Sequence, residues 1–356
     1  MKKALIVTTV SGFVPQFEMN NVKILQEMEY EVHYASNFHN VSYGVDNRRL
    51  EGTGIIQHQV DFSRSPFMLF KFIHAYKQMK KLLVEEDFSL LHCHTPVAAV
   101  IARLVARSYR KKGMKVLYTA HGFHFYKGAP LQYWLLFYPV ECFLARYTDI
   151  LITINKEDYE RAKRFCKNKK VKVEYLPGVG IDISYWSGKD LTDKEREEIR
   201  QKTRKELGVL DSEKMLLSVG ELIPRKNHIS VIEGLVKWKA TQSNDLVPFH
   251  YFISGQGVLK EELQKLIKEK NMEDCITLLG YRTDIRNILY ATDLFIFPSK
   301  QEGLPVALLE AIAAGVQVKA SNIRGNRELY NISKEELQEY DEEHIKQRMK
   351  SILGNL

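Results

Sequence analysis

Short apolar runs alternate with amphipathic or charged helical stretches along both halves of the chain, and this alternation constrains the fold more than any other feature. Runs such as Ala4–Val10, Ile150–Ile154 and Met215–Val219 are typical of strands that are covered on both faces. Stretches such as Lys156–Phe165 between them have the length and polarity of surface helices. Since strands separated by helices pair in parallel, the sequence predicts an α/β fold with two doubly wound domains.

The boundary between the two domains is predicted where a strand runs into a Pro-Gly-x-Gly linker at Pro177–Gly180. A chain of 356 residues is also too long for one ordinary domain and comfortable for two. We therefore expect an N-terminal domain over 1–178, a second domain over 179–332 and C-terminal helices over 333–356.

Charge divides unevenly between the two halves. Residues 1–178 hold 26 Lys and Arg against 16 Asp and Glu, a net charge of +10, and the remainder holds 26 against 28, a net charge of −2. A basic half favours anionic phosphates or an anionic membrane surface as partners. Nucleic acid is not expected, because the sequence has no zinc-finger spacing and no RNA-recognition signature.

Composition also bears on the compartment. No apolar run reaches the roughly 18 residues that a membrane-spanning helix needs. The 4 cysteines are scattered without a C-x-x-C pair, which favours reduced thiols and a cytoplasmic protein.

Two segments of the first half could contact a membrane or an apolar ligand. Ser65–Val84 has apolar residues at helical spacing beside four lysines, so it either packs on its sheet or lies at the surface of acidic lipid. The basic cluster over 107–115 adds to the second interpretation. The aromatic and aliphatic stretch Tyr133–Leu144 could fill the core or offer an apolar surface to a lipid-linked acceptor.

The stretch 294–311 predicts a buried strand, a polar loop and a helix. Gly303 lets backbone approach a ligand closely, and Pro305 suits the first helical turn. The free amides of a helix N-terminus can hold a phosphate. Glu302 lies in the loop and Glu310 about two turns up the helix, so that one carboxylate could bind sugar hydroxyls and the other a ribose. Alternatively, both glutamates are exposed helix residues.

Other strand ends carry further candidates. Arg225 and Lys226 lie in a strand-to-helix loop, where they could bind a diphosphate or form a solvated charge pair. Gly12 follows the first strand, and His121 lies where a parallel strand delivers ligand-binding residues. No metal site is expected at His92–His94, because successive strand residues point to opposite faces.

The residues Glu302 to Glu310 resemble the Glu-x7-Glu motif of the retaining family-4 glycosyltransferases of the GT-B fold. The match includes the Glu-Gly-Leu-Pro start and the Leu-Leu-Glu-Ala end, and it extends to 291–293 upstream and 321–328 downstream. The run Tyr118–Gly128, continued by Trp134 and Glu141, is similar to capsule and exopolysaccharide transferases of the same family.

The resemblance implies a role for each matching residue. It implies that His121 and Glu302 contact the donor sugar and act in catalysis, and that Glu310 binds the nucleotide ribose. It further implies a donor-binding set made of Gly12, Arg225, Lys226, Gly303, Leu304, Pro305, Tyr281 and Arg282. Many members carry an Arg where this chain has Glu221, so Arg225 would have to compensate.

The resemblance also implies a fold and a function. The fold is two Rossmann-like domains facing a central cleft, with the last helix packing back on the first domain. The C-terminal domain is expected to be shortened after Glu328. The implied activity is retaining transfer of a hexosyl or N-acetylhexosaminyl group from a nucleotide-sugar, expected to be a UDP-sugar, to a lipid-linked or polysaccharide acceptor.

Capsule, exopolysaccharide or lipopolysaccharide synthesis is the expected setting, at the inner face of the cell membrane. No cofactor is expected, and no metal, because the sequence has no Asp-x-Asp motif. Two alternatives remain: a non-catalytic subunit of a polysaccharide-assembly complex, and a GT-B nucleotide-sugar 2-epimerase.

Overall fold

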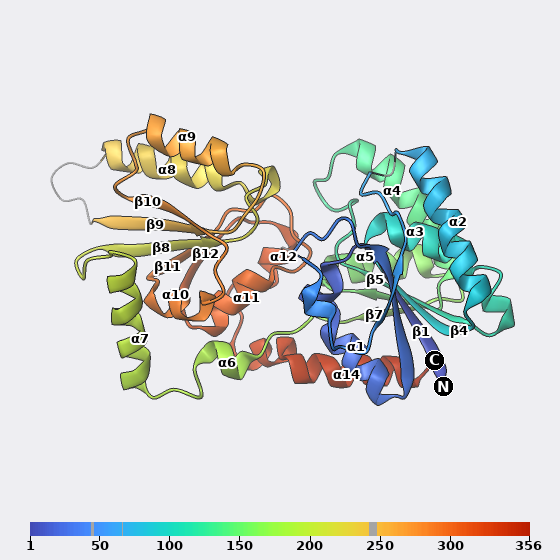
Figure 1. Ribbon diagram of the computed structural model, residues 1–356. Coiled ribbons are helices and arrows are strands. Elements are labelled where there is room, and N and C mark those ends of the chain that lie inside the picture. The colour runs from blue at the N-terminus through green and yellow to red at the C-terminus, as the bar shows by residue number, and fades with distance from the viewer. Residues whose placement is uncertain (44–45, 66, 242–247) are drawn as a thin grey trace. The chain divides into compact units, whose positions relative to one another are not determined.

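The computed structural model describes residues 1–43, 46–65, 67–241 and 248–356 (Figure 1). The chain divides into two compact units. Unit 1 comprises Met1–Gly180 together with Glu343–Leu356, and unit 2 comprises Ile181–Glu342. Both units are α/β, so the fold class expected from the strand–helix alternation is confirmed.

Unit 1 is built on a parallel sheet of seven strands in the order β3-β2-β1-β4-β5-β6-β7. The strands are β1 (Lys2–Val10), β2 (Tyr30–Asn37), β3 (Ile56–Gln59), β4 (Phe88–His94), β5 (Lys115–Ala120), β6 (Ile150–Thr153) and β7 (Lys172–Tyr175). The chain order reverses between β1 and β4, which are neighbours in the sheet. Loops leaving the carboxyl ends of these two strands therefore diverge and leave room for a ligand.

Helices cover both faces of this sheet. The helices are α1 (Met19–Glu27), α2 (Leu69–Glu85), α3 (Pro96–Ala106), α4 (Leu131–Leu144), α5 (Lys156–Cys166) and α14 (Glu342–Gly354). Alternate strand residues supply two cores: Leu5 and Val7 of β1 pack toward α2, α3 and α5, whereas Ala4 and Ile6 pack toward α1 and α14. This alternation is the period-2 pattern of a strand that is buried on both sides.

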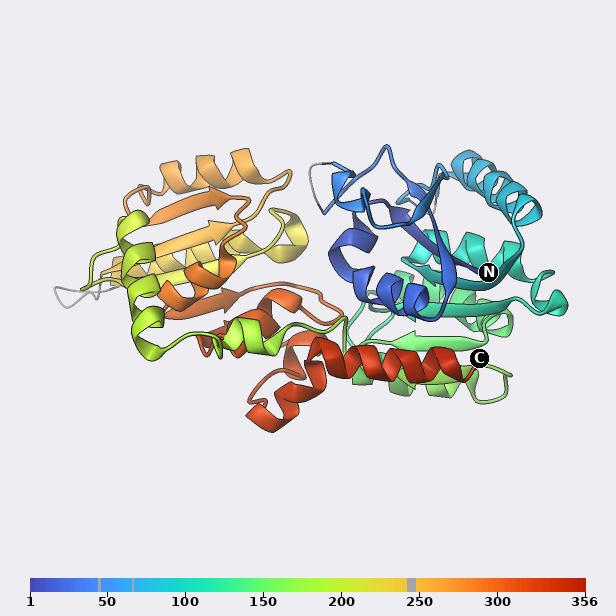
Figure 2. The ribbon, with the colours of Figure 1, turned by 60° about the horizontal axis from the view of Figure 1, so that its bottom comes forward.

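The C-terminal helix α14 belongs to unit 1 and runs along it toward the C-terminus (Figure 2). Ile345, Met349 and Ile352 of this helix are all buried in the core beside α1. On the polar side, Lys350 and Lys346 both pair with Glu27 of α1.

A buried ion pair ties α3 to α4 inside unit 1. Arg103 donates to both carboxylate oxygens of Glu141, at 2.8 and 3.1 Å, and its guanidinium lies 4.0 Å from the centre of the Tyr118 ring. The outer side of α4 remains exposed, with Leu131 and Leu135 more than two-thirds accessible. The aromatic stretch predicted over 133–144 thus divides between core and surface.

Unit 2 is built on a parallel sheet of five strands in the order β10-β9-β8-β11-β12. The strands are β8 (Lys214–Val219), β9 (Phe249–Ser254), β10 (Ile276–Gly280), β11 (Leu294–Phe297) and β12 (Gln317–Ala320). The helices are α6 (Ile183–Ser187), α7 (Asp193–Glu206), α8 (His228–Thr241), α9 (Lys260–Glu269), α10 (Ile285–Ala291), α11 (Val306–Ala313), α12 (Arg324–Arg327) and α13 (Lys334–Leu337). The order of this sheet reverses between β8 and β11.

Two local features of unit 2 follow from its sequence. β12 lies at the edge of the sheet and Lys319 is exposed there, as expected for a lysine that would be costly to bury. The capping box at the start of α13 is present, with Ser333 accepting from the backbone amide of Glu336.

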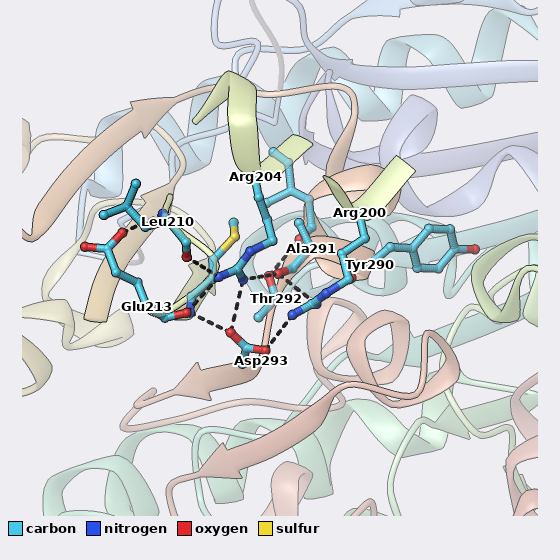
Figure 3. Close-up of polar contacts among 10 residues, drawn as sticks. Arg200, Arg204, Leu210, Glu213, Tyr290, Ala291, Thr292 and Asp293 are labelled. Carbon is cyan, nitrogen blue, oxygen red and sulfur yellow. Dashed lines mark hydrogen bonds and ion pairs between the residues drawn. The ribbon is translucent and has the colours of Figure 1, made fainter. Parts of the chain in front are cut away.

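A network of arginines fastens α7 to the sheet of unit 2 (Figure 3). Arg204 is buried and donates to the carbonyl oxygens of Leu210, Glu213 and Ala291. Arg200 and Arg204 both pair with Asp293, at 2.7 and 3.1 Å. Asp293 precedes β11, so this network also fixes the strand that leads into the Glu302 loop.

Candidate active site

The loops after β8 and β11 lie side by side at the carboxyl edge of the sheet of unit 2. The loop after β8 contains a 3₁₀ turn over Pro224–Lys226, and the loop after β11 leads into α11. The amide of Lys300 donates to the carbonyl of Arg225 at 2.9 Å, which joins the two loops directly. This edge, at the point where the strand order reverses, is where doubly wound sheets bind their ligands.

Glu302 forms ion pairs with both cations of the loop after β8. Lys226 Nζ lies 2.8 Å from one carboxylate oxygen, and an Arg225 guanidinium nitrogen lies 3.0 Å from the other. Arg225 also donates to the carbonyl of Gln301 at 2.9 Å. Glu302 is 8% exposed, so the alternative that both glutamates are exposed helix residues is wrong for this one.

The charge state of Glu302 follows from these contacts. Burial by itself would raise the pKa of the carboxyl group, but Lys226 and Arg225 outweigh it and hold the pKa below its ordinary value. Glu302 is therefore ionised at neutral pH. Glu221 also belongs to the cluster, because its carboxylate lies 4.0 Å from an Arg225 guanidinium nitrogen, so two cations face two carboxylates here.

Glu310 has the opposite environment. It is half-buried on α11, and burial raises its pKa from an ordinary value of 4.5 to about 7. A carboxyl group with so strongly perturbed a pKa is a candidate for a functional site.

The other residues predicted in unit 2 are placed as follows. Gly303, Leu304 and Pro305 form the turn from Glu302 into α11, with Pro305 at the N-cap position. Tyr281 and Arg282 follow β10; the Tyr281 side chain is 59% exposed, and Arg282 pairs with the Asp284 carboxylate through two nitrogens. The Arg282 guanidinium is therefore already paired with a carboxylate of the protein.

In unit 1, Gly12 lies two residues after the end of β1, and its lack of a side chain has a packing reason. A Cβ atom there would lie 1.7 Å from the carbonyl oxygen of Ser42. The amide of Gly12 also donates to the carbonyl of Val41 at 2.7 Å. The glycine thus lets a second loop approach the end of β1.

His121 follows β5, as predicted, and meets two residues from elsewhere in the sequence. His121 Nε2 lies 3.0 Å from His94 Nδ1 at the end of β4, and 3.3 Å from a carboxylate oxygen of Glu18. Glu18 ends a π-helical turn over Val14–Glu18, and such turns often occur at functional sites. Sequence patterns gave no sign of Glu18, because a single glutamate after an irregular turn has no periodic signal.

Burial and neighbouring side chains set the protonation states of Glu18, His92 and His94. Burial would raise the pKa of Glu18, but the neighbouring imidazoles of His94 and His121 lower it to about 2. Burial lowers the pKa of His92 to about 4 and that of His94 well below its ordinary value. At neutral pH Glu18 is ionised while His92 and His94 are neutral.

Two family profiles match most of the chain between them. The family described as "Glycosyl transferase 4-like" matches residues 4–155, and the family described as "Glycosyl transferases group 1" matches residues 199–355.

Individual relatives agree with these profiles. The chain is 33% identical over 328 residues to the putative glycosyltransferase EpsD of Bacillus subtilis, covering 92% of this chain and 81% of the relative. It is 31% identical over 261 residues to the UDP-Gal:alpha-D-GlcNAc-diphosphoundecaprenol alpha-1,3-galactosyltransferase of Escherichia coli, covering 72% of this chain and 64% of the relative.

Solved structures share the fold at lower identity. The crystal structure of Anabaena Alr3699/HepE in complex with UDP-glucose aligns over 100% of both chains with a TM-score of 0.75 and 16% identity. The structure of WaaG, a glycosyltransferase involved in lipopolysaccharide biosynthesis, aligns over 99% of this chain and 92% of its own, with a TM-score of 0.65 and 17% identity. The chain is a glycosyltransferase and belongs to the family-4 glycosyltransferases of the GT-B fold.

Proposed function

We propose that the protein transfers a sugar from a UDP-sugar to a lipid-linked acceptor, with retention of the anomeric configuration, during the synthesis of a cell-surface polysaccharide. The observation that carries the donor assignment is the cluster of Lys226, Arg225 and Glu302 at the carboxyl edge of the sheet of unit 2. The UDP-Gal donor and diphosphoundecaprenol-linked acceptor in the name of the Escherichia coli relative support the choice of substrates.

In this proposal the cations of the cluster bind the donor diphosphate. Lys226 and Arg225 now neutralise Glu302, and the diphosphate would take over part of that pairing while Glu302 turns to the sugar hydroxyls. Backbone amides at the start of α11, beyond Pro305, add further donors for phosphate oxygens. Stabilising the departing diphosphate in this way lowers the barrier without a metal at that position.

Glu310 is assigned to the ribose and His121 to the donor sugar. Glu310 lies on α11 little more than one turn after the helix begins at Val306, and it is half-buried there. His121 lies in unit 1, where its side chain is 20% exposed. We assign these contacts because Glu310 and His121 match the family residues that bind the ribose and the donor sugar.

The acceptor and the membrane are assigned to unit 1. Phe67, Leu69 and Phe70, at and before the start of α2, are 65–88% exposed, and α4 exposes further apolar side chains. Among the described residues no helix is long and apolar enough to cross a bilayer, so contact with lipid would be made from the surface. The +10 net charge of residues 1–178 favours an anionic leaflet.

Calorimetric titration with UDP tests the donor assignment. Lys226→Ala removes a charged hydrogen bond to phosphate, worth about 1.5–3 kcal/mol, so UDP should bind roughly 10- to 100-fold more weakly. Lys300→Ala is the matched control, because Lys300 is exposed in the neighbouring loop and its side chain is not part of the Glu302 cluster. Equal UDP affinity in the wild type and Lys226→Ala would contradict the phosphate role.

A further inference from the structure

A pocket of about 600 Å³ lies at the carboxyl edge of the sheet of unit 1, beside the first turns of α2. Its polar and aromatic lining comes from the ends of β2 and β3 and from α2, and includes Asn37, His39, Asp61, Phe70, Lys71 and His74. The carboxyl ends of parallel strands are where such sheets bind ligands. None of these side chains takes part in the donor contacts proposed above, so the pocket is a separate candidate site.

The carboxylate of Asp61 is held in place on the wall of this pocket. Gln59 Nε2 donates to one oxygen at 2.7 Å, and the other oxygen lies 2.9 Å from Gln78 Nε2 and 3.1 Å from His74 Nε2. The hydrogen bond from Gln59, followed by those from Gln78 and His74, holds the pKa of Asp61 below its ordinary value. An ionised carboxylate has roughly four lone-pair positions, so Asp61 can still accept from a hydroxyl group of a ligand.

Lys71 is a cation without a partner in the same pocket. Its side chain is exposed, and within the described residues its ammonium group forms no ion pair or hydrogen bond. The Asp61 carboxylate is already engaged by other side chains, and the exposed imidazole of His39 adds a further possible donor. An exposed lysine is ordinary by itself. Beside a pocket and a fixed carboxylate, however, it favours a ligand that combines phosphate oxygens with hydroxyl groups.

The side of the pocket formed by α2 is apolar at the protein surface. Phe70 lines the pocket and is 88% exposed, and Phe67 and Leu69, which precede it in the chain, are exposed as well. Exposed apolar side chains beside a polar pocket indicate an amphiphilic ligand, because a free sugar or a free phosphate would leave them in water.

We propose that this pocket binds the sugar–diphosphate head of an isoprenoid-linked acceptor. Lys71 and His39 donate to the diphosphate oxygens, and Asp61 accepts from a sugar hydroxyl. Phe70 lies against the first isoprene units. This inference rests on the proposed function, which gives the protein a lipid-linked acceptor, and it names the residues that bind that acceptor. Since the donor diphosphate is assigned to unit 2, binding of the two substrates can be measured separately.

Calorimetry of the full-length protein with a water-soluble acceptor analogue tests the proposal. The probe is N-acetylglucosaminyl diphosphate carrying a citronellyl chain, which presents the diphosphate and the isoprenoid without a vesicle. The wild type should bind it. Lys71→Ala should bind it about tenfold or more weakly, because a charged hydrogen bond to phosphate is lost. Lys71→Arg, which keeps the charge, should bind within a few-fold of the wild type.

The controls separate this pocket from general charge effects. Lys77→Ala removes an exposed lysine of the same helix that does not line the pocket, and it should bind the probe as the wild type does. UDP affinity should be the same in every variant, which shows that the donor site is intact. Dihexanoyl phosphatidylglycerol, a lipid phosphate without the sugar diphosphate, should not displace the probe at equal concentration.

Three results would overturn the proposal: no binding of the probe by the wild type, equal binding by the wild type and Lys71→Ala, or displacement of the probe by dihexanoyl phosphatidylglycerol. The last would indicate a general site for anionic lipid. Failure of the proposed function gives a different result, because a protein that binds the probe through Lys71 would then bind no UDP or transfer no sugar.

Discussion

Glu302 and Glu310 show how two carboxyl groups of one motif acquire different properties from their surroundings. Glu302 is held ionised by Lys226 and Arg225, whereas burial raises the pKa of Glu310 to about 7. Opposed environments of this kind often assign separate roles to titratable groups in one site. Burial therefore disfavours the ionised form of Glu310, whereas the ion pairs of Glu302 favour the ionised form of that group.

Glu310→Gln should change how stability depends on pH. The folded-state pKa of Glu310 lies above its ordinary value of 4.5, so the stability that it contributes is complete below pH 4.5 and is lost as the pH rises through about 7. Glutamine removes this dependence. At pH 8 the variant should be more stable than the wild type, by up to about 3 kcal/mol at about 1.4 kcal/mol per pKa unit.

Urea denaturation at pH 5 and pH 8 measures the effect. Glu262→Gln, on the exposed side of α9, is the control and should leave the pH dependence unchanged. A Glu310→Gln protein with the same loss of stability between pH 5 and pH 8 as the wild type would contradict the assigned pKa.

At the residue scale, site residues within one motif could be predicted from the sequence, whereas contacts between residues far apart in the chain could not. The spacing of Glu302 and Glu310 is visible in one stretch, and the family motif points to Lys226. The pairing of Lys226 with Glu302 joins residues 76 positions apart, and only the sheet order brings them together. Because successive strand residues point to opposite faces of the sheet, the Cys93 side chain points away from those of His92 and His94. The sequence could not show that His94 contacts Glu18 and His121, because those residues come from other elements.

At the element scale, buried parallel strands were the most predictable parts of the chain. Apolar runs such as 4–10 and 215–219 became β1 and β8 because both faces of each strand are covered. The helix predicted over 65–84 runs from Leu69 to Glu85; residue 66 lies outside the described part, and Phe67 precedes the helix. Helix α3, rich in alanine and valine, was not predicted, because burial on nearly every side leaves it little polar periodicity.

The helices α2 and α4 both pack on α3, and their exposed apolar side chains should dock unit 1 on anionic membranes. Co-sedimentation of the wild type with anionic vesicles should be strong, should weaken with added salt and should be weak with neutral vesicles, because each basic residue near the surface adds about 1 kcal/mol. Phe70→Ser combined with Leu135→Ser should reduce binding severalfold.

The control for docking is Val258→Ser, which removes an equally exposed apolar side chain from unit 2. It should bind vesicles as the wild type does. Equal binding of the wild type to neutral and anionic vesicles, or none to either, would reject docking through this surface.

At the scale of the whole molecule, the chain consists of two doubly wound units with different charge. The carboxyl edge of unit 2 holds Arg225 and Lys226 paired with Glu302, and that of unit 1 holds Glu18 with His94 and His121. Family membership accounts for the fold and the class of reaction. The sugar and the acceptor depend on contacts that the motifs do not encode, so the sequence could not predict them.

Sugar transfer by the full-length protein tests the central claim most directly. A panel of UDP-sugars is incubated with a lipid-diphosphate-linked sugar acceptor, and the product and its anomeric configuration are determined by NMR. The wild type should form a retained product from one donor, and only when acceptor is present. Glu302→Gln should lower turnover by orders of magnitude while binding UDP within a few-fold of the wild type. Tight UDP binding by the wild type without transfer, or undiminished transfer by Glu302→Gln, would contradict the account.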